Sequence, residues 1–253
     1  MNKALLILIL IILIILLCYN NKHKYENFKV YNKIDKIYVI NLKKNQDRLE
    51  KFMENAKKAN VEVERFDAVY GKELKKDHPD IFKYFGKYPN IHSGEIGCAL
   101  SHIKIWEDAI KNNYNNIIVF EDDAIIPKDF WDRFDKAYNE LPEDWEMLLI
   151  GCCTCTGNTT NKTKLIKANS TGNWCLSGYL IQNNYCKKLI DRIYKNKIEK
   201  SIDEYTRMFY SNDNVYIPLP PFILQDKNFN SDIIMGELGN TLQIDNKNPI
   251  IWK

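Results

Sequence analysis

Apolar residues along the chain follow two different periods. Short apolar or alternating runs, typical of strands, are found at 37–42, 61–66, 117–120, 145–151, 174–181 and 214–219. Between them, apolar residues recur every three or four positions, as on an amphipathic helix, at 46–59, 96–106, 130–134, 184–195 and 202–210. This repeated alternation of strand and helix predicts an α/β fold, with a largely parallel or mixed sheet flanked by helices.

The chain begins with an uninterrupted apolar run. Every residue from Ala4 to Cys18 is apolar, and Tyr19 stands where an interfacial aromatic residue is expected. The run is shorter than the ~20 residues that span a bilayer comfortably, and no small-residue cleavage site follows it. We therefore predict an uncleaved signal anchor at 1–19, a short stem at 20–34 and a single domain at 35–253. Lysines on both sides of the run leave its orientation open.

Composition narrows the function classes. The 36 Lys and Arg residues exceed the 33 Asp and Glu residues only slightly, and they are spread along the chain, which argues against a nucleic-acid partner. Hydrophobic residues make up 45% of the sequence, which is enough for a substantial core.

The cysteines are concentrated in one short run. GCCTC at 151–155 has neither a second cysteine pair nor a nearby histidine, so it does not predict a zinc site. A disulfide from this run to Cys175 or Cys186 and free buried thiols both remain open. Asn158, Asn161 and Asn169 each begin a glycosylation acceptor triplet, which would suit a lumenal glycoprotein.

The most informative stretch is the run IIVF at 117–120, which leads directly into Glu121, Asp122 and Asp123. Three adjacent carboxylates repel one another, and their desolvation is costly without a partner. They could lie in a solvated turn. However, ligands of α/β sheets bind at the carboxyl ends of the strands, and clustered carboxylates there suit Mg²⁺ or Mn²⁺. Such a cation can bind a diphosphate, as nucleotide-sugar transferases require.

The other motifs are weak by themselves. GEIGCALSH at 94–102 lacks the glycines of a phosphate-binding loop or a dinucleotide fingerprint. His102 is the kind of residue that is more often satisfied within a helix than a ligand. Arg48 could decorate a solvated helix face or could meet a phosphate.

Several segments together resemble glycosyltransferase family 25, the group that contains lipooligosaccharide galactosyltransferases and collagen hydroxylysine galactosyltransferases. The matching segments are YVINLKKNQDR (38–48), FDAVYG (66–71), GEIGCALSHIKIWEDAI (94–110), IIVFEDDA (117–124), LSGYLIQNNYCKKLI (176–190) and PPFILQDKNFNSDI (220–233). The resemblance implies a GT-A type, Rossmann-like fold for the domain, a UDP-sugar donor, Mn²⁺ or Mg²⁺ as cofactor, and inversion at the anomeric carbon.

The resemblance also implies roles for particular residues. Asp123 is expected to bind the metal, with Glu121 as a further ligand, and Glu121 and Asp122 are expected near the ribose or the metal's water shell. The nucleotide and its phosphates are assigned to Asn41 and Arg48. The residues expected to shape the donor pocket are Glu95, Ser101 and His102.

Inversion needs a general base for the acceptor hydroxyl. The candidates are Asp203 and Asp232, in segments that resemble the family's C-terminal motifs, and either could instead complete the metal shell.

We therefore predict a membrane-anchored, metal-dependent inverting glycosyltransferase. It would move a hexose, galactose or glucose, from a UDP-sugar to a hydroxyl of a glycan or of a hydroxylysine-type side chain. The predicted location is the lumenal face of the ER or Golgi, with the cytoplasmic face of a membrane as the alternative. The rival function is a catalytically silent, membrane-tethered binding module.

Overall fold

The centre of the fold is a seven-stranded mixed sheet. The computed structural model describes residues 9–16, 31–75, 78–86, 91–151, 164–172, 175–226 and 228–229. The strands of the sheet are β1 (Lys36–Asn41), β2 (Glu64–Asp67), β3 (Asn116–Glu121), β5 (Met147–Gly151), β6 (Lys164–Lys167), β7 (Gly178–Gln182) and β8 (Val215–Leu219), in the order β2-β1-β3-β7-β5-β8-β6. The pairs β1·β2, β1·β3 and β5·β8 are parallel, and the other three pairs are antiparallel. The predicted α/β class with a mixed sheet is confirmed.

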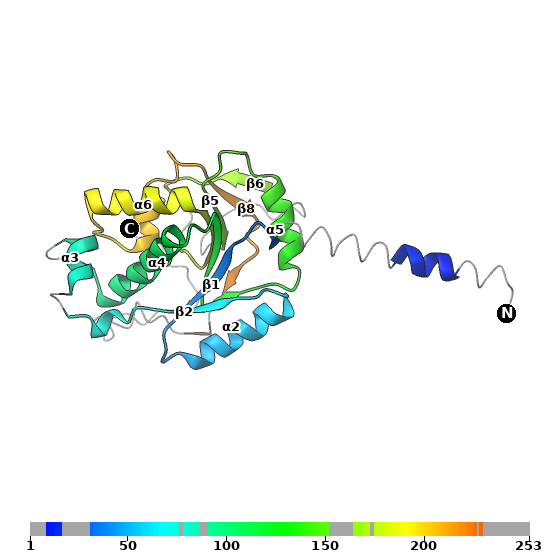
Figure 1. Cartoon of the computed structure of the whole chain (residues 1–253), viewed down its shortest axis with the longest axis horizontal. Helices are drawn as coiled ribbons and strands as arrows, with labels where there is room; N and C mark the ends of the chain where they lie inside the picture. Colours follow the sequence, from blue (N-terminus) through cyan, green and yellow to red (C-terminus); the bar gives the residue numbers. More distant parts are fainter. Residues whose placement is uncertain are drawn as a thin grey trace.

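Helices cover both faces of this sheet (Figure 1). They are α2 (Gln46–Lys58), α3 (Pro79–Phe85), α4 (Ser93–Lys111), α5 (Phe130–Asn139), α6 (Asn183–Asn196) and α7 (Ile202–Arg207). Successive side chains of a strand point to opposite faces. Accordingly, Tyr38 and Ile40 join the core beneath α4 and α6, whereas Ile37 and Val39 join the core beneath α2 and α5. Both faces of the central strands are therefore buried.

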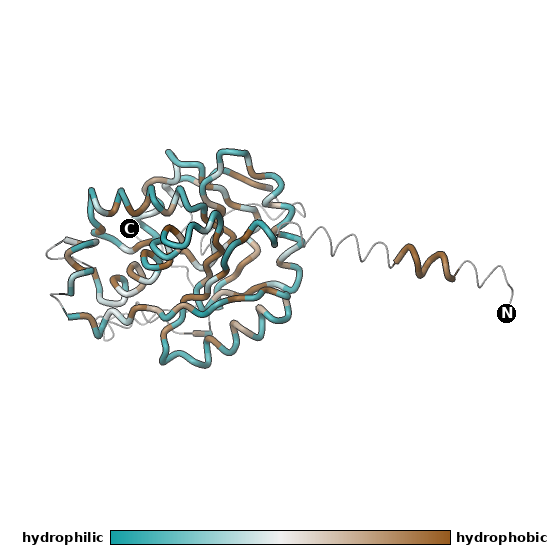
Figure 2. Tube along the Cα trace, in the orientation of Figure 1, coloured by the Kyte–Doolittle hydropathy of each residue, from teal (hydrophilic) through white to brown (hydrophobic). Residues whose placement is uncertain are grey.

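Hydropathy follows this layering. In Figure 2 the central strands are largely brown, while the outer turns of the helices are largely teal. The four interior positions of β3 are buried, and its two end residues, Asn116 and Glu121, are half-buried. The apolar run that precedes the three acids is thus a core strand, as the sequence predicts.

The predicted membrane anchor is wrong. Within the described part of the first segment, residues 9–16 are helical, with exposed apolar side chains, and appear brown in Figure 2. No helix among the described residues is long and apolar enough to cross a membrane. This finding overturns the anchor at 1–19 and, with it, the single-pass membrane location.

Two of the cysteine alternatives are resolved. Cys186 is a free, buried thiol, and Cys175 is disulfide-bonded. The GCCTC cysteines and the acceptor residues Asn158 and Asn161 lie outside the described residues. The boundaries of the predicted stem and domain stay a prediction.

Candidate active site

The acids lie at one edge of the sheet, where several strand ends meet. β1 and β3 are parallel neighbours, so their last residues, Asn41 and Glu121, share this edge. β7 runs antiparallel to β3 and begins at the same edge, where the backbone N–H of Glu121 donates to the carbonyl of Ser177 at 3.1 Å. The turn that follows β3 carries Asp122 and Asp123 and leads into the short strand β4 (Ala124–Ile125).

Asp122 is held by two neighbours. Its Oδ2 accepts a hydrogen bond of 2.7 Å from Nδ2 of Asn41, and its Oδ1 forms an ion pair with Arg48. Asn41 is itself fixed, because Nε of Arg65 donates to its Oδ1 at 3.0 Å and its Nδ2 also reaches the carbonyl of Asn45. Asn41 and Asp122 are both buried. In this arrangement they support the turn, and their polar atoms point toward each other rather than outward.

Asp123 is placed differently. Its Oδ2 accepts from Nε2 of Gln225 at 2.9 Å and lies 3.4 Å from Arg48. Its Oδ1 is buried and has no hydrogen-bond partner among the described residues. Burial, followed by the negative charge of Glu121, raises the pKa of Asp123 to about 7, although Gln225 and Arg48 act in the opposite direction. A buried carboxylate oxygen with no partner is costly, and a bound cation would remove that cost.

A short C-terminal segment covers this turn. The strand β9 (Leu224–Gln225) pairs with β4, and the N–H of Asp226 donates to the carbonyl of Asp123 at 2.7 Å. Asp226 also forms an ion pair with Lys51 of α2, which keeps the pKa of Asp226 below its usual value. The ring of Phe229 lies 5.4 Å from the Arg48 guanidinium and 5.0 Å from the Lys51 ammonium.

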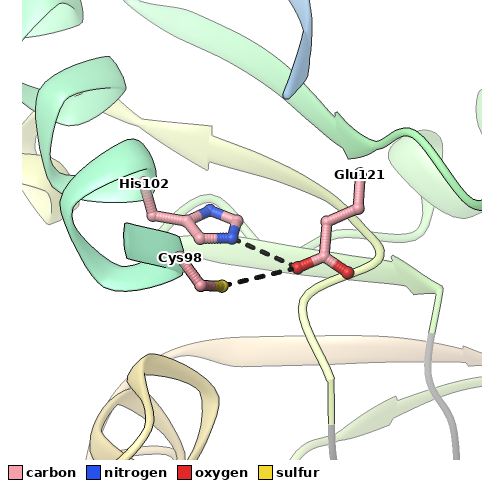
Figure 3. A group of neighbouring side chains, drawn as sticks. All are labelled: Cys98, His102 and Glu121. Carbon is pink, nitrogen blue, oxygen red and sulfur yellow. Dashed lines mark hydrogen bonds and ion pairs between the residues drawn. The ribbon is translucent and has the colours of Figure 1, made fainter. Parts of the chain in front are cut away.

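Glu121 faces helix α4. Its Oε1 lies 3.4 Å from Nε2 of His102 and 4.0 Å from Sγ of Cys98, as Figure 3 shows. The ligand atoms of these three residues all lie within 4.8 Å of one another, close enough for a metal ion. Oε2 of Glu121 makes no hydrogen bond or ion pair with any other described residue, and the side chain is 22% exposed.

The other two α4 residues of the predicted site, Glu95 and Ser101, bind backbone groups and so stabilise the fold around the site. Glu95 accepts the N–H of His92 at 2.9 Å and so caps the start of the helix. The Ser101 hydroxyl donates to the carbonyl of Gly97 at 2.7 Å and accepts the N–H of Val69 at 2.9 Å. Ser101 thereby joins the FDAVYG turn to the GEIGCALSH helix.

Of the two candidate bases, Asp203 and Asp232, the structure describes only Asp203. Asp203, in the first turn of α7, accepts the backbone N–H of Cys175 at 3.3 Å. Burial, and then the charges of Glu121, Asp203, Asp123 and Glu95 in that order, raises the pKa of the Cys98 thiol well above its usual value. Asp203 and the acids after β3 therefore both act electrostatically on Cys98. Asp232 lies outside the described residues.

Sequence comparison gives this site a family. Residues 34–206, well over half of the chain, match the model of "Glycosyltransferase family 25 (LPS biosynthesis protein)". The chain belongs to glycosyltransferase family 25. The predicted family and enzyme class are thereby confirmed.

Curated family 25 relatives match most of this chain. A "Glycosyltransferase 25 family member" of Aedes aegypti is 29% identical over 71% of this chain and 31% of its own length. The human "Procollagen galactosyltransferase 2" is 27% identical over 72% of this chain and 31% of its own length. The chain thus spans about a third of these relatives. A crystal structure of a glycosyltransferase involved in glycosylation of the major capsid of PBCV-1 has a TM-score of 0.45 and 6% identity over 78% of this chain and 94% of that one, too distant a likeness to bear on the assignment.

Several residues that sequence reasoning did not single out contact the residues of this family 25 site. Five of these are Lys51, Arg65, Cys98, Gln225 and Asp226. Three of them lie inside segments that carry the family resemblance, GEIGCALSHIKIWEDAI and PPFILQDKNFNSDI. The signal was therefore present, but the segments alone do not say which of their residues face the acids.

Proposed function

We propose that the protein transfers a hexose from a UDP-sugar to a hydroxyl acceptor, with a divalent cation bound by Asp123 and Glu121. The proposal rests on two carboxylate oxygens that accept no hydrogen bond from any described residue. Within the described part of the chain, Asp123 Oδ1 is buried and has no hydrogen-bond partner, and Glu121 Oε2 makes no hydrogen bond or ion pair. Both belong to the turn at the end of β3, where a ligand of an α/β sheet binds.

The reaction is a single displacement with inversion. The acceptor oxygen forms a bond to the anomeric carbon while the bond from that carbon to the donor's phosphate oxygen breaks. The hydroxyl proton passes to a carboxylate, and the electron pair leaves with UDP. A divalent cation held by Asp123 and Glu121 would supply charge stabilisation for the departing diphosphate.

The chain's own residues divide the remaining work. Asp122 and Asn41 hold the turn in place, and Arg48 contributes positive charge at the same edge. Asp203 is the described acid that we propose as the base, because its charge acts on Cys98, whose thiol lies 4.0 Å from Glu121. Asp232 remains the alternative.

The donor and acceptor are proposed from the relatives. The human relative is named a procollagen galactosyltransferase, which supports UDP-galactose ahead of UDP-glucose as the donor. The same name supports a hydroxylated side chain as acceptor, while the description of the family model, LPS biosynthesis, supports a glycan hydroxyl.

The test is UDP release by the full-length chain. A panel of UDP-sugars is offered with Mn²⁺ or with EDTA, because slow donor hydrolysis reports the donor even when the acceptor is unknown. We expect release that requires metal, prefers one sugar and is abolished by Asp123→Asn. The matched control is Asp191→Asn on the exposed face of α6, which should keep full activity. Absence of release with every donor would instead favour a non-catalytic binding role.

A further inference from the structure

A chain of buried hydrogen bonds leads from the core to Glu121. Nε1 of Trp106 donates to the hydroxyl oxygen of Tyr179 at 3.0 Å. The same hydroxyl lies 2.8 Å from Nδ1 of His102, whose Nε2 lies 3.4 Å from Oε1 of Glu121. The side chains of Trp106, Tyr179 and His102 have no exposed surface, so solvent does not reach the two contacts among these three residues.

The direction of each bond follows from counting donors. An indole N–H can only donate, so the Tyr179 oxygen is the acceptor in its contact with Trp106. The Tyr179 hydroxyl proton then needs an acceptor of its own. Among the described residues, His102 Nδ1 is the one acceptor within hydrogen-bond distance of it. Tyr179 therefore donates to Nδ1, and Nδ1 carries no proton.

The tautomer of His102 is thereby fixed. A neutral imidazole with a bare Nδ1 carries its proton on Nε2. We infer that Tyr179 and His102 are positioning residues of the active site, in which Tyr179 sets the Nε2–H tautomer and His102 holds Glu121 by its Oε1. The inference rests on the proposed function only for its consequence, which is that Oε2 is turned toward the cation and the donor.

Other protonation states leave groups unsatisfied. With the proton on Nδ1, the Tyr179 O–H would have no acceptor, and a bare Nε2 would face the Glu121 carboxylate. A doubly protonated ring would leave the same Tyr179 proton without an acceptor. Each of these states costs more than the relay, in which every donor has a partner.

The relay also bears on the cluster in Figure 3. Cys98, His102 and Glu121 are spaced as metal ligands could be. A metal ion there would need the lone pair of Nε2, and the relay places a proton on that atom. The inference therefore predicts that the three residues hold a hydrogen bond and not an ion.

The first test is NMR of full-length protein labelled with ¹⁵N in its histidines. The chain has four histidines, and the signal of His102 is the one lost in His102→Gln. Long-range ¹H–¹⁵N correlations distinguish the two neutral tautomers and the charged ring. We expect Nε2–H in the wild type, unchanged in Tyr38→Phe and altered in Tyr179→Phe. Tyr38 is a matched control, because it too is buried and its hydroxyl bonds to α4, through Asp108.

Kinetics provide the second test. Tyr179→Phe should lower kcat and weaken activation by Mn²⁺ about 10- to 100-fold, with little change in the KM of the acceptor. His102→Gln retains an N–H donor and should keep more activity than His102→Leu. These readouts require a working transferase, whereas the NMR spectrum does not, so failure of the proposed function and failure of the relay are distinguishable.

Two results would overturn the inference. One is an Nδ1–H or doubly protonated His102 in the wild-type spectrum. The other is a thiolate-to-metal absorption band on adding Co²⁺ that disappears in Cys98→Ser, which would show that the cluster binds a metal ion through the Cys98 thiolate instead.

Discussion

Replacement of Asp123 by asparagine should stabilise the metal-free protein, and increasingly so as the pH rises. The Asp123 side chain is 15% exposed and lies near the negative charge of Glu121, and partial burial first, then that charge, raise the pKa of Asp123 to about 7 from an ordinary value of 3.8. A group whose folded-state pKa is raised contributes stability that is complete below the unfolded pKa. That contribution is lost as the pH rises through the folded pKa. Asparagine does not titrate, so the variant escapes this loss.

The size of the effect follows from the shift. Each pH unit between the two pKa values costs about 1.4 kcal/mol, so the full shift corresponds to about 4 kcal/mol. Between pH 5 and pH 8, the gain of the variant over the wild type should therefore grow by up to about 3 kcal/mol. The asparagine amide will lack a partner at the Oδ1 position, which offsets about 1–3 kcal/mol at every pH. The change with pH is thus the informative quantity.

The assay is urea denaturation in EDTA at pH 5, 6.5 and 8, with Asp123→Asn beside the wild type. Asp191→Asn, which alters an exposed carboxylate, serves as the control and should give a difference that does not depend on pH. If the difference between Asp123→Asn and the wild type is flat from pH 5 to 8, the carboxylate is not the strained group described here. A stabilised but inactive variant would show that the acid is retained for function at a cost in stability.

Other parts of the fold give further expectations. Gly97→Ala would place a methyl carbon 2.5 Å from the carbonyl oxygen of Val69, so we expect urea titrations to show a loss of about 1–3 kcal/mol in the free energy of unfolding. The control is Gly172→Ala, whose methyl meets nothing nearer than 3.9 Å and which should change this free energy by less than about 0.5 kcal/mol. Equal effects of the two substitutions would refute the close contact at Gly97. Burial by itself would raise the pKa of Asp213, but hydrogen bonds from Arg192 and a neighbouring lysine keep it below its usual value. Stability from this carboxylate is therefore complete above about pH 4 and should be lost as the pH falls through the lower folded-state value, and an acid-unfolding curve unchanged in Asp213→Asn would contradict this. Arg192→Met leaves a buried carboxylate short of its bidentate partner and should cost about 3–5 kcal/mol in thermal or urea unfolding; a loss below 1 kcal/mol would show that the pair is not coupled.

The sequence was a good guide to where the acids lie. The run 117–120 is apolar on both faces, as in a strand that is buried on both sides of a sheet, and the acids come directly after it. Local pattern therefore sufficed to predict β3 and the turn. It could not separate Asp122 from Asp123, because their difference lies in which side chains approach them. Asn41 binds Asp122 from 81 positions away in the sequence, and Gln225 binds Asp123 from 102 positions away.

Strand boundaries show the same limit. The alternating run 61–66 predicts a strand, yet pairing with β1 begins at Glu64, opposite Tyr38. Hydrogen bonding to a neighbour defines a strand, and the neighbour's position is not visible in the run itself. The short strands β4 and β9 pair only because the chain returns to the site near its described end, so no periodicity announces them.

The most direct test of the central claim is calorimetry of UDP binding to the full-length protein with and without Mn²⁺. We expect UDP to bind when Mn²⁺ is present and to fail to bind in EDTA. We also expect that Asp123→Asn removes the metal-dependent binding, while Asp191→Asn retains it. UDP binding that is equal in EDTA and in Mn²⁺, or that survives in Asp123→Asn, would contradict the claim that the carboxylates after β3 hold a cation for the donor's diphosphate.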